Sequence, residues 1–152
     1  MGSRLYPLVL EPIYKYRIWG GRRLEKLLGK KLPPDQPIGE SWEVSCRDSD
    51  NNVIRNGELA GKTLADVFAS SREALLGASA HAARFDSAGA QSRPGGTPST
   101  KFPLLNKSID ANDLLSVQVH PDERTAAAFA GADAKTEAWY IIRADPGARL
   151  IR

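Results

Sequence analysis

The stretch Leu114-Leu-Ser-Val-Gln-Val-His-Pro-Asp122 alternates apolar and polar side chains up to its proline. Successive side chains of a β-strand point to opposite faces, so Ser116, Gln118 and His120 are predicted to share one face of a strand. The aliphatic residues between them would share the other face. This strand is therefore expected to border a core on one side and a polar cavity on the other.

A second stretch, Lys135-Thr-Glu-Ala-Trp-Tyr-Ile-Ile142, has the same character. On a strand, Lys135 and Glu137 would share one face with Trp139 and Ile141. If the two strands line one cavity, an amide, an imidazole, a carboxylate and an ammonium group meet in it.

The rest of the chain reads as strands joined by short helices. Strands are expected over 39–45 and 102–110, the latter with Leu104 and Leu105 buried and paired with 114–120, and residues 6–18 are expected to be extended. Trp19-Gly20-Gly21 reads as a tight break and 48–52 as a polar loop. Helices are expected over 22–28, ended by Gly29, over 64–69 after an N-cap at Thr63, over 72–76, and within 121–133 after a cap at Asp122.

Composition indicates one soluble globular domain. The chain has 152 residues, 41% hydrophobic and 26% charged, with a net charge of +3. No apolar run approaches the roughly 20 residues of a membrane span, and no secretory signal is visible, so a cytoplasmic location is expected by default. The basic residues are scattered, which favours a phosphorylated metabolite over nucleic acid as the anionic partner. A single cysteine, Cys46, excludes an internal disulfide and reads as a small, partly buried residue.

Two segments stand outside the regular pattern. Residues 77–101 are rich in Ala, Gly, Ser, Pro and Thr without an apolar period, and are expected to form a flexible loop in which His81 is a bystander. Near Leu150 another strand is expected to start, and it would stop at Arg152. The sequence therefore reads as the first half of a larger sheet.

Gln118, His120 and Glu137 are candidate metal ligands, because zinc accepts imidazole nitrogen and carboxylate oxygen, although amide oxygen is an uncommon ligand. The residues alone are equally compatible with structural roles that involve no metal. His120 would equally serve as a hydrogen-bonded core histidine, and Lys135 with Glu137 as a surface ion pair of little energetic value. Ser116 would be a polar residue on a solvent-exposed strand face. Trp19 and Trp42 would pack in the core or at its rim.

Five motifs in order resemble type I mannose-6-phosphate isomerases, closest to the short bacterial form. They cover nearly the whole chain apart from 77–101. The motifs are Pro12 followed by Ile18-Trp-Gly-Gly21, then Gly39-Glu-Ser-Trp-Glu43, Phe102-Pro-Leu-Leu-Asn-Lys107, Leu115-Ser-Val-Gln-Val-His-Pro-Asp122 and Lys135-Thr-Glu-Ala-Trp-Tyr140.

The resemblance implies a mainly β, cupin-like (jelly-roll) barrel that is incomplete in this chain, so that 1–152 is a single N-terminal portion of a catalytic domain. It implies interconversion of mannose 6-phosphate and fructose 6-phosphate with one zinc ion. The zinc ligands carry over to Gln118, His120 and Glu137, and a fourth, a histidine, lies beyond Arg152 in the family. Ser116, Lys135 and Trp19 correspond to residues of the sugar-phosphate site, with Lys135 also the catalytic candidate.

The resemblance leaves other readings to be weighed. Family members are roughly twice as long, so the 152-residue chain is expected to be inactive unless a second chain completes it. A non-catalytic cupin fragment or sugar-phosphate-binding module is the main alternative. A metal-dependent oxygenase of the cupin class is weaker, because a histidine is expected where Gln118 stands. The sequence does not determine the oligomeric state.

Overall fold

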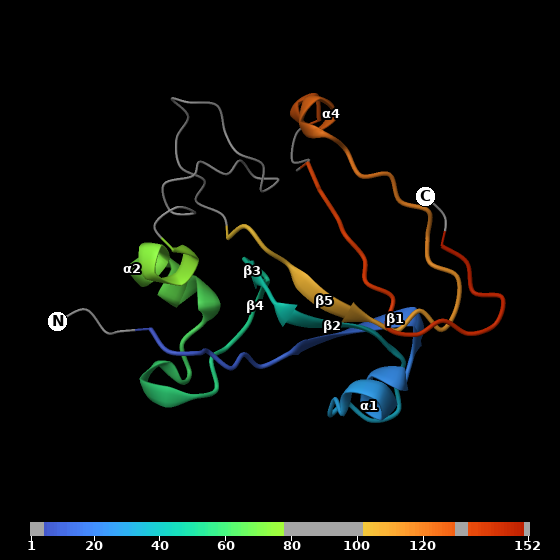
Figure 1. Cartoon of the computed structure of the whole chain (residues 1–152), viewed down its shortest axis with the longest axis horizontal. Helices are drawn as coiled ribbons and strands as arrows, with labels where there is room; N and C mark the ends of the chain where they lie inside the picture. Colours follow the sequence, from blue (N-terminus) through green and yellow to red (C-terminus); the bar gives the residue numbers. More distant parts are fainter. Residues whose placement is uncertain (1–4, 78–101, 130–133, 151–152) are drawn as a thin grey trace.

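The computed structural model describes residues 5–77, 102–129 and 134–150. A three-stranded antiparallel sheet lies at the centre, with α1 near one end and α2 near the other (Figure 1). The predicted loop at 77–101 lies outside the described residues apart from Gly77, the C-cap of the preceding helix. In the described part of the chain, no helix is both long and apolar enough to cross a membrane.

The sheet has the order β1 (Ile13–Gly21), β2 (Ile38–Val44) and β5 (Asn106–Ile109). The strand predicted over 39–45 is confirmed as β2. The break predicted at Trp19-Gly20-Gly21 is wrong, because β1 continues to Gly21. A Cβ on Gly20 would lie 2.3 Å from the backbone nitrogen of Gly39, so a residue without a side chain lets the two strands approach.

Helix α1 (Arg23–Leu28) confirms the first predicted helix. Gly29 ends it in the left-handed conformation, with φ of 64°, and returns its N–H to the carbonyls of the last turn. Leu24 of the helix packs with Leu32 and Ile38 in a small core that Tyr14 borders. This core fixes α1 against the β1–β2 end of the sheet.

A hairpin and a helix follow β2. The expected polar loop over 48–52 is instead partly strand, since β3 (Cys46–Arg47) pairs with β4 (Asp50–Asn51). Buried Asn52 explains the tight hairpin: its amide donates to the carbonyls of Glu11 and Trp42 and accepts from the N–H of Ser45. A short 3-10 helix (Gly57–Leu59) leads on toward α2.

Helix α2 (Leu64–Leu76) joins the two helices predicted over 64–69 and 72–76. Ser71 has non-helical dihedrals (φ −142°, ψ 39°), which marks the boundary that the sequence indicated. Thr63 is the N-cap, as predicted. Phe68 is buried and meets Phe102 edge to face at 5.4 Å between ring centroids, which attaches the helix to the approach to β5.

The strand expected over 102–110 is shorter and pairs elsewhere. Only Asn106–Ile109 form β5, which pairs with β2 in the register Glu40 to Ile109, not with 114–120. Leu104, expected to be buried, is 54% exposed, because it precedes the ladder and has no strand beside it. The edge of the sheet beyond β5 has no partner strand among the described residues.

The two strands predicted over 114–120 and 135–143 are not formed in the described chain. Both segments lack regular secondary structure, and Figure 1 shows them as ribbons on either side of α4 (Glu123–Ala127). A strand needs a ladder partner, and the described residues supply none for either segment. The predicted cap of α4 is confirmed, since the Asp122 carboxylate accepts the N–H of Thr125 at 2.7 Å. Phe129, which follows the helix, is 64% exposed.

Candidate metal and substrate site

Three of the predicted site residues meet in one cluster. His120 Nε2 lies 2.5 Å from Glu137 Oε2, and Lys135 Nζ lies 3.1 Å from that nitrogen and 3.3 Å from that oxygen. An imidazole, a carboxylate and an ammonium group therefore share a single point of contact. We refer to His120, Lys135 and Glu137 as the triad.

The chain between the two segments explains why the triad forms. After His120 the proline cannot donate a hydrogen bond, and the capping bond of Asp122 starts α4 at once. The chain then returns so that the N–H of Lys135 donates to the carbonyl of Pro121 at 3.2 Å. Buried Ala126 and Ala134 accompany this return. The bond between Lys135 and Pro121 thus brings the ends of the two segments together.

The neighbours of Glu137 in the triad favour its ionised form. Partial burial by itself raises the pKa of Glu137, but the hydrogen bond with His120 and the nearby charge of Lys135 outweigh it and hold that pKa below its usual 4.5. Glu137 is therefore ionised at neutral pH.

Gln118 and Ser116 lie beside the triad in sequence but not in contact with it. The Gln118 amide donates to Ser116 Oγ at 3.3 Å, as expected for residues on one side of an extended segment. No hydrogen bond joins either side chain to the triad among the described residues. Both are exposed, because the segment has no neighbouring strand to turn them inward.

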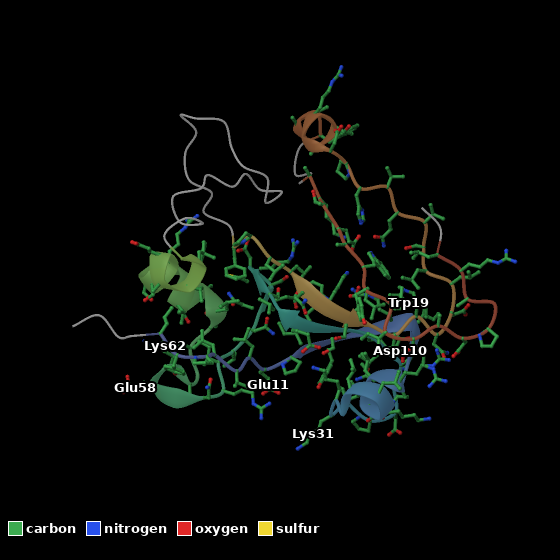
Figure 2. All side chains as sticks on the ribbon, in the orientation of Figure 1. Glu11, Trp19, Lys31, Glu58, Lys62 and Asp110 are labelled. Atoms are coloured by element: carbon green, nitrogen blue, oxygen red, sulfur yellow. The ribbon has the colours of Figure 1, made fainter. Side chains whose placement is uncertain are left out.

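Trp19 occupies a different position. It lies near the end of β1, where its ring covers Gly39; a Cβ on that glycine would be 2.5 Å from Trp19 Cζ3. Its carbonyl accepts the N–H groups of Asn112 and Asp113, at 3.0 and 3.2 Å. Figure 2 shows Trp19 near Asp110 at this end of the sheet. No hydrogen bond joins its side chain to the triad in the described chain.

A second polar cluster, which the sequence reasoning did not assign, lies on the sheet. Buried Glu40 accepts from Arg17 at 2.8 Å, from Lys107 at 3.0 Å and from the Trp42 indole N–H at 3.1 Å. Burial raises the pKa of Glu40, but the hydrogen bonds of Lys107 and Trp42, with the charges of Lys107 and Arg17, bring it below its usual value. Lys15 adds a cation over the Trp42 ring, 4.8 Å from the centroid.

The sequence contains part of the pattern that forms this cluster, but the rest depends on how the strands pair. Glu40 and Trp42 alternate on β2, which indicates a shared face. Lys107 reaches the same face only because β5 pairs with β2 so that Lys107 lies opposite Trp42. The sequence did not predict that pairing.

One hollow is lined by residues of both clusters. It has a volume of about 1180 Å³ and is lined by residues of α1, β5 and the 134–143 segment. Lys107, Lys135 and Glu137 are among its lining residues. Two lysines and a glutamate thus line a space large enough for a small anionic metabolite.

Two of the three groups of the triad, the imidazole of His120 and the carboxylate of Glu137, are of the kinds that zinc accepts as ligands. His120 Nε2 and Glu137 Oε2 are bonded to each other at 2.5 Å, and the Lys135 ammonium lies within 3.3 Å of both, so a divalent cation would have to take the place of these contacts. In the residues that the structure describes, no group of three His, Cys, Asp or Glu side chains gathers. A four-coordinate zinc site would therefore need donors in addition to His120 and Glu137.

Comparison with known proteins gives the family. A family model for the catalytic domain of type I phosphomannose isomerases matches residues 8–140. The chain belongs to this family. A mannose-6-phosphate isomerase of Streptococcus mutans is 39% identical over 145 residues, which is 95% of this chain and 40% of the relative. A probable mannose-6-phosphate isomerase of Bacillus subtilis, GmuF, is 40% identical over 148 residues, covering 96% of this chain and 40% of that protein.

A solved structure of this family has a related fold. The crystal structure of the mannose 6-phosphate isomerase from Bacillus subtilis superposes with a TM-score of 0.62 at 30% identity, covering 80% of this chain and 32% of the other. The mainly β architecture is that of an incomplete cupin-like barrel, as the sequence predicted. The chain spans about 40% of the length of the curated relatives it matches.

Proposed function

We propose that this chain provides the metal- and substrate-binding wall of a zinc-dependent isomerase that interconverts mannose 6-phosphate and fructose 6-phosphate. The observation that carries the proposal is the triad, because imidazole, carboxylate and ammonium groups meet at one point beside the hollow. Membership of the phosphomannose isomerase family supports the substrate class.

We assign the roles from the chemistry of each side chain. His120 and Glu137 would hold zinc, with Gln118 as the third ligand and the fourth supplied from outside 1–152. When bound, zinc supplies polarisation and orientation of the sugar oxygens. Ser116 and Trp19 are proposed to line the sugar-phosphate site, on the family correspondence alone.

Lys135 is the proposed catalytic residue. Aldose–ketose isomerisation through a cis-enediol moves a proton between C1 and C2 and develops negative charge on the sugar oxygen. The Lys135 ammonium is held 3.3 Å from Glu137 and lines the hollow, so it is placed to neutralise either that charge or the substrate phosphate.

Zinc binding is tested on the purified 152-residue chain by elemental analysis and calorimetric titration. We expect binding that is lost in His120→Ala and in Glu137→Ala. His81→Ala is the matched control, since it removes the other of the two histidines. Equal zinc content in wild type and His120→Ala would refute the assigned ligands.

Turnover is tested separately with mannose 6-phosphate. We propose that 1–152 alone binds the sugar phosphate without isomerising it, because its assigned ligands number three and its sheet edge beyond β5 has no described partner. Isomerisation by the purified chain that disappears in His120→Ala would contradict this part of the proposal. A binding module without turnover is thus the second candidate function.

A further inference from the structure

Arg23 bonds to two parts of the chain that are distant in sequence. Its backbone N–H donates to Asp110 Oδ2 at 2.7 Å, 87 residues away. Its guanidinium donates to Asp145 Oδ2 at 2.5 Å, 122 residues away. The two carboxylates lie on either side, in sequence, of the chain that carries the triad and Gln118.

Asp110 fixes the beginning of that chain. Its side chain is buried, with the residue 4% exposed, and it follows β5 directly. The backbone N–H of Asp110 donates to the Gly39 carbonyl at 2.9 Å, and the N–H groups of Asn112 and Asp113 donate to the Trp19 carbonyl. The 114–120 segment therefore follows a stretch of backbone that is hydrogen-bonded to β1 and β2.

Asp145 fixes the end. It follows the 135–143 segment and begins a turn in which the N–H of Ala148 donates to the Asp145 carbonyl at 3.0 Å. The side chains of the Arg23–Asp145 pair are 42% and 40% exposed, so the pair is a modest restraint by itself. The distal ends of the two segments are joined by the Lys135–Pro121 bond.

We propose that Arg23 is a positioning residue for the candidate metal site, holding together the bases of the two segments through Asp110 and Asp145. The segments have no ladder to align them among the described residues, so their separation depends on bonds at their ends. The metal readout below rests on the proposed function, whereas the distance readout does not.

The first experiment measures the separation of the segments directly. Spin labels are placed at Val117→Cys and Tyr140→Cys, positions 93% and 90% exposed, in a Cys46→Ser background. Pulsed electron resonance then gives the label-to-label distance distribution. We expect Arg23→Gln and Asp145→Asn each to broaden it, because either removes one charge of the Arg23–Asp145 ion pair and leaves the Arg23 N–H in place.

Two further variants test whether the broadening is specific to the Arg23–Asp145 pair. Arg55→Gln is the matched control, since Arg55 forms another exposed arginine ion pair, with Glu11 at 3.0 Å. It should leave the distribution unchanged. The exchanged pair Arg23→Asp with Asp145→Arg should restore the narrow distribution. An unchanged distribution in both Arg23→Gln and Asp145→Asn would overturn the proposal.

The second experiment measures zinc affinity by competition with a chelator. Loss of an exposed ion pair that aligns the ligands should weaken zinc binding about two- to fivefold in Arg23→Gln, with recovery in the exchanged pair. Undiminished affinity in Arg23→Gln would overturn the positioning role. Failure of the wild-type chain to bind zinc would instead refute the proposed function, and the label distances would still decide whether Arg23 positions the segments.

Discussion

At the scale of single residues, the buried Glu40 joins the three strands of the sheet through its side chain. One buried carboxylate accepts from Arg17, Lys107 and Trp42, which come from all three strands of the sheet. A buried carboxylate is stable only when such donors replace its water. Glu40 therefore joins the strands chemically as well as through their backbones.

The stability of the fold should depend on pH through Glu40. Its pKa in the folded chain is below the usual 4.5, so the ionised side chain contributes stability above that pH. The contribution is lost as the pH falls through the folded pKa. We expect Glu40→Gln to lower the free energy of unfolding at pH 7 by about 1–3 kcal/mol and to flatten its decline below pH 4.5.

Urea unfolding of both proteins between pH 7 and pH 3 checks this expectation. Glu58→Gln, which removes an exposed carboxylate, is the control for the change in net charge. Parallel pH profiles for wild type and Glu40→Gln would contradict the assignment.

At the scale of elements, the start of α2 is determined by a capping box. The Thr63 hydroxyl accepts the N–H of Asp66, and the Asp66 carboxylate accepts the N–H of Thr63 at 2.8 Å. Both bonds satisfy N–H groups that the first helical turn leaves without intrahelical partners. The buried residues Leu64, Val67 and Phe68 follow immediately, so the cap also aligns the packing face of the helix.

We expect Thr63→Ala to lower the free energy of unfolding by about 1 kcal/mol, because it removes one of the two capping bonds. Thr63→Ser keeps the hydroxyl and should lose much less. Urea denaturation followed by circular dichroism measures both. An alanine variant as stable as the serine variant would show that the box contributes nothing to the helix.

The sequence predicted those elements that depend on residues near each other in the chain. The caps at Thr63 and Asp122, the stop at Gly29 and strand β2 could all be read from neighbouring residues. The pairing of β5 with β2 could not, because register depends on strands far apart in sequence. The alternation over 114–120 correctly placed Ser116 and Gln118 together, yet alternation alone does not supply a partner strand.

The candidate site was predictable to a similar degree. His120, Lys135 and Glu137 were expected to meet, and they do, because the α4 turn brings the two segments together. Gln118 was expected to meet them too, but among the described residues its side chain bonds to Ser116 and not to the triad. The Glu40 cluster was missed because it is assembled across three strands.

At the scale of the whole molecule, the described chain presents unusual apolar exposure on its two extended segments. Leu114, Val117, Val119 and Tyr140 are between 89% and 93% exposed. Apolar side chains gathered in this way usually mark surfaces that other protein covers. The exposure agrees with a chain that spans about 40% of the length of its relatives.

We expect the purified 152-residue chain to self-associate as its concentration rises. Replacing Val117 and Val119 together by threonine should reduce the association, since both side chains are almost fully exposed. Sedimentation velocity over a range of concentrations measures this. Val9→Thr, at a half-exposed position outside the two extended segments, is the control. Association unaffected by the double substitution would exclude this surface.

The pairing of β2 with β5 also determines where the length of the chain can change. Val44 lies opposite Asn106, so residues 45–105 form the connection that this pairing closes. The entropy of closing such a connection varies with the logarithm of its length. Deleting all of 78–101 would change the closure free energy by only about 0.4 kcal/mol. That interval is therefore a suitable insertion point for a fused domain or an optical reporter, at little thermodynamic cost to the sheet.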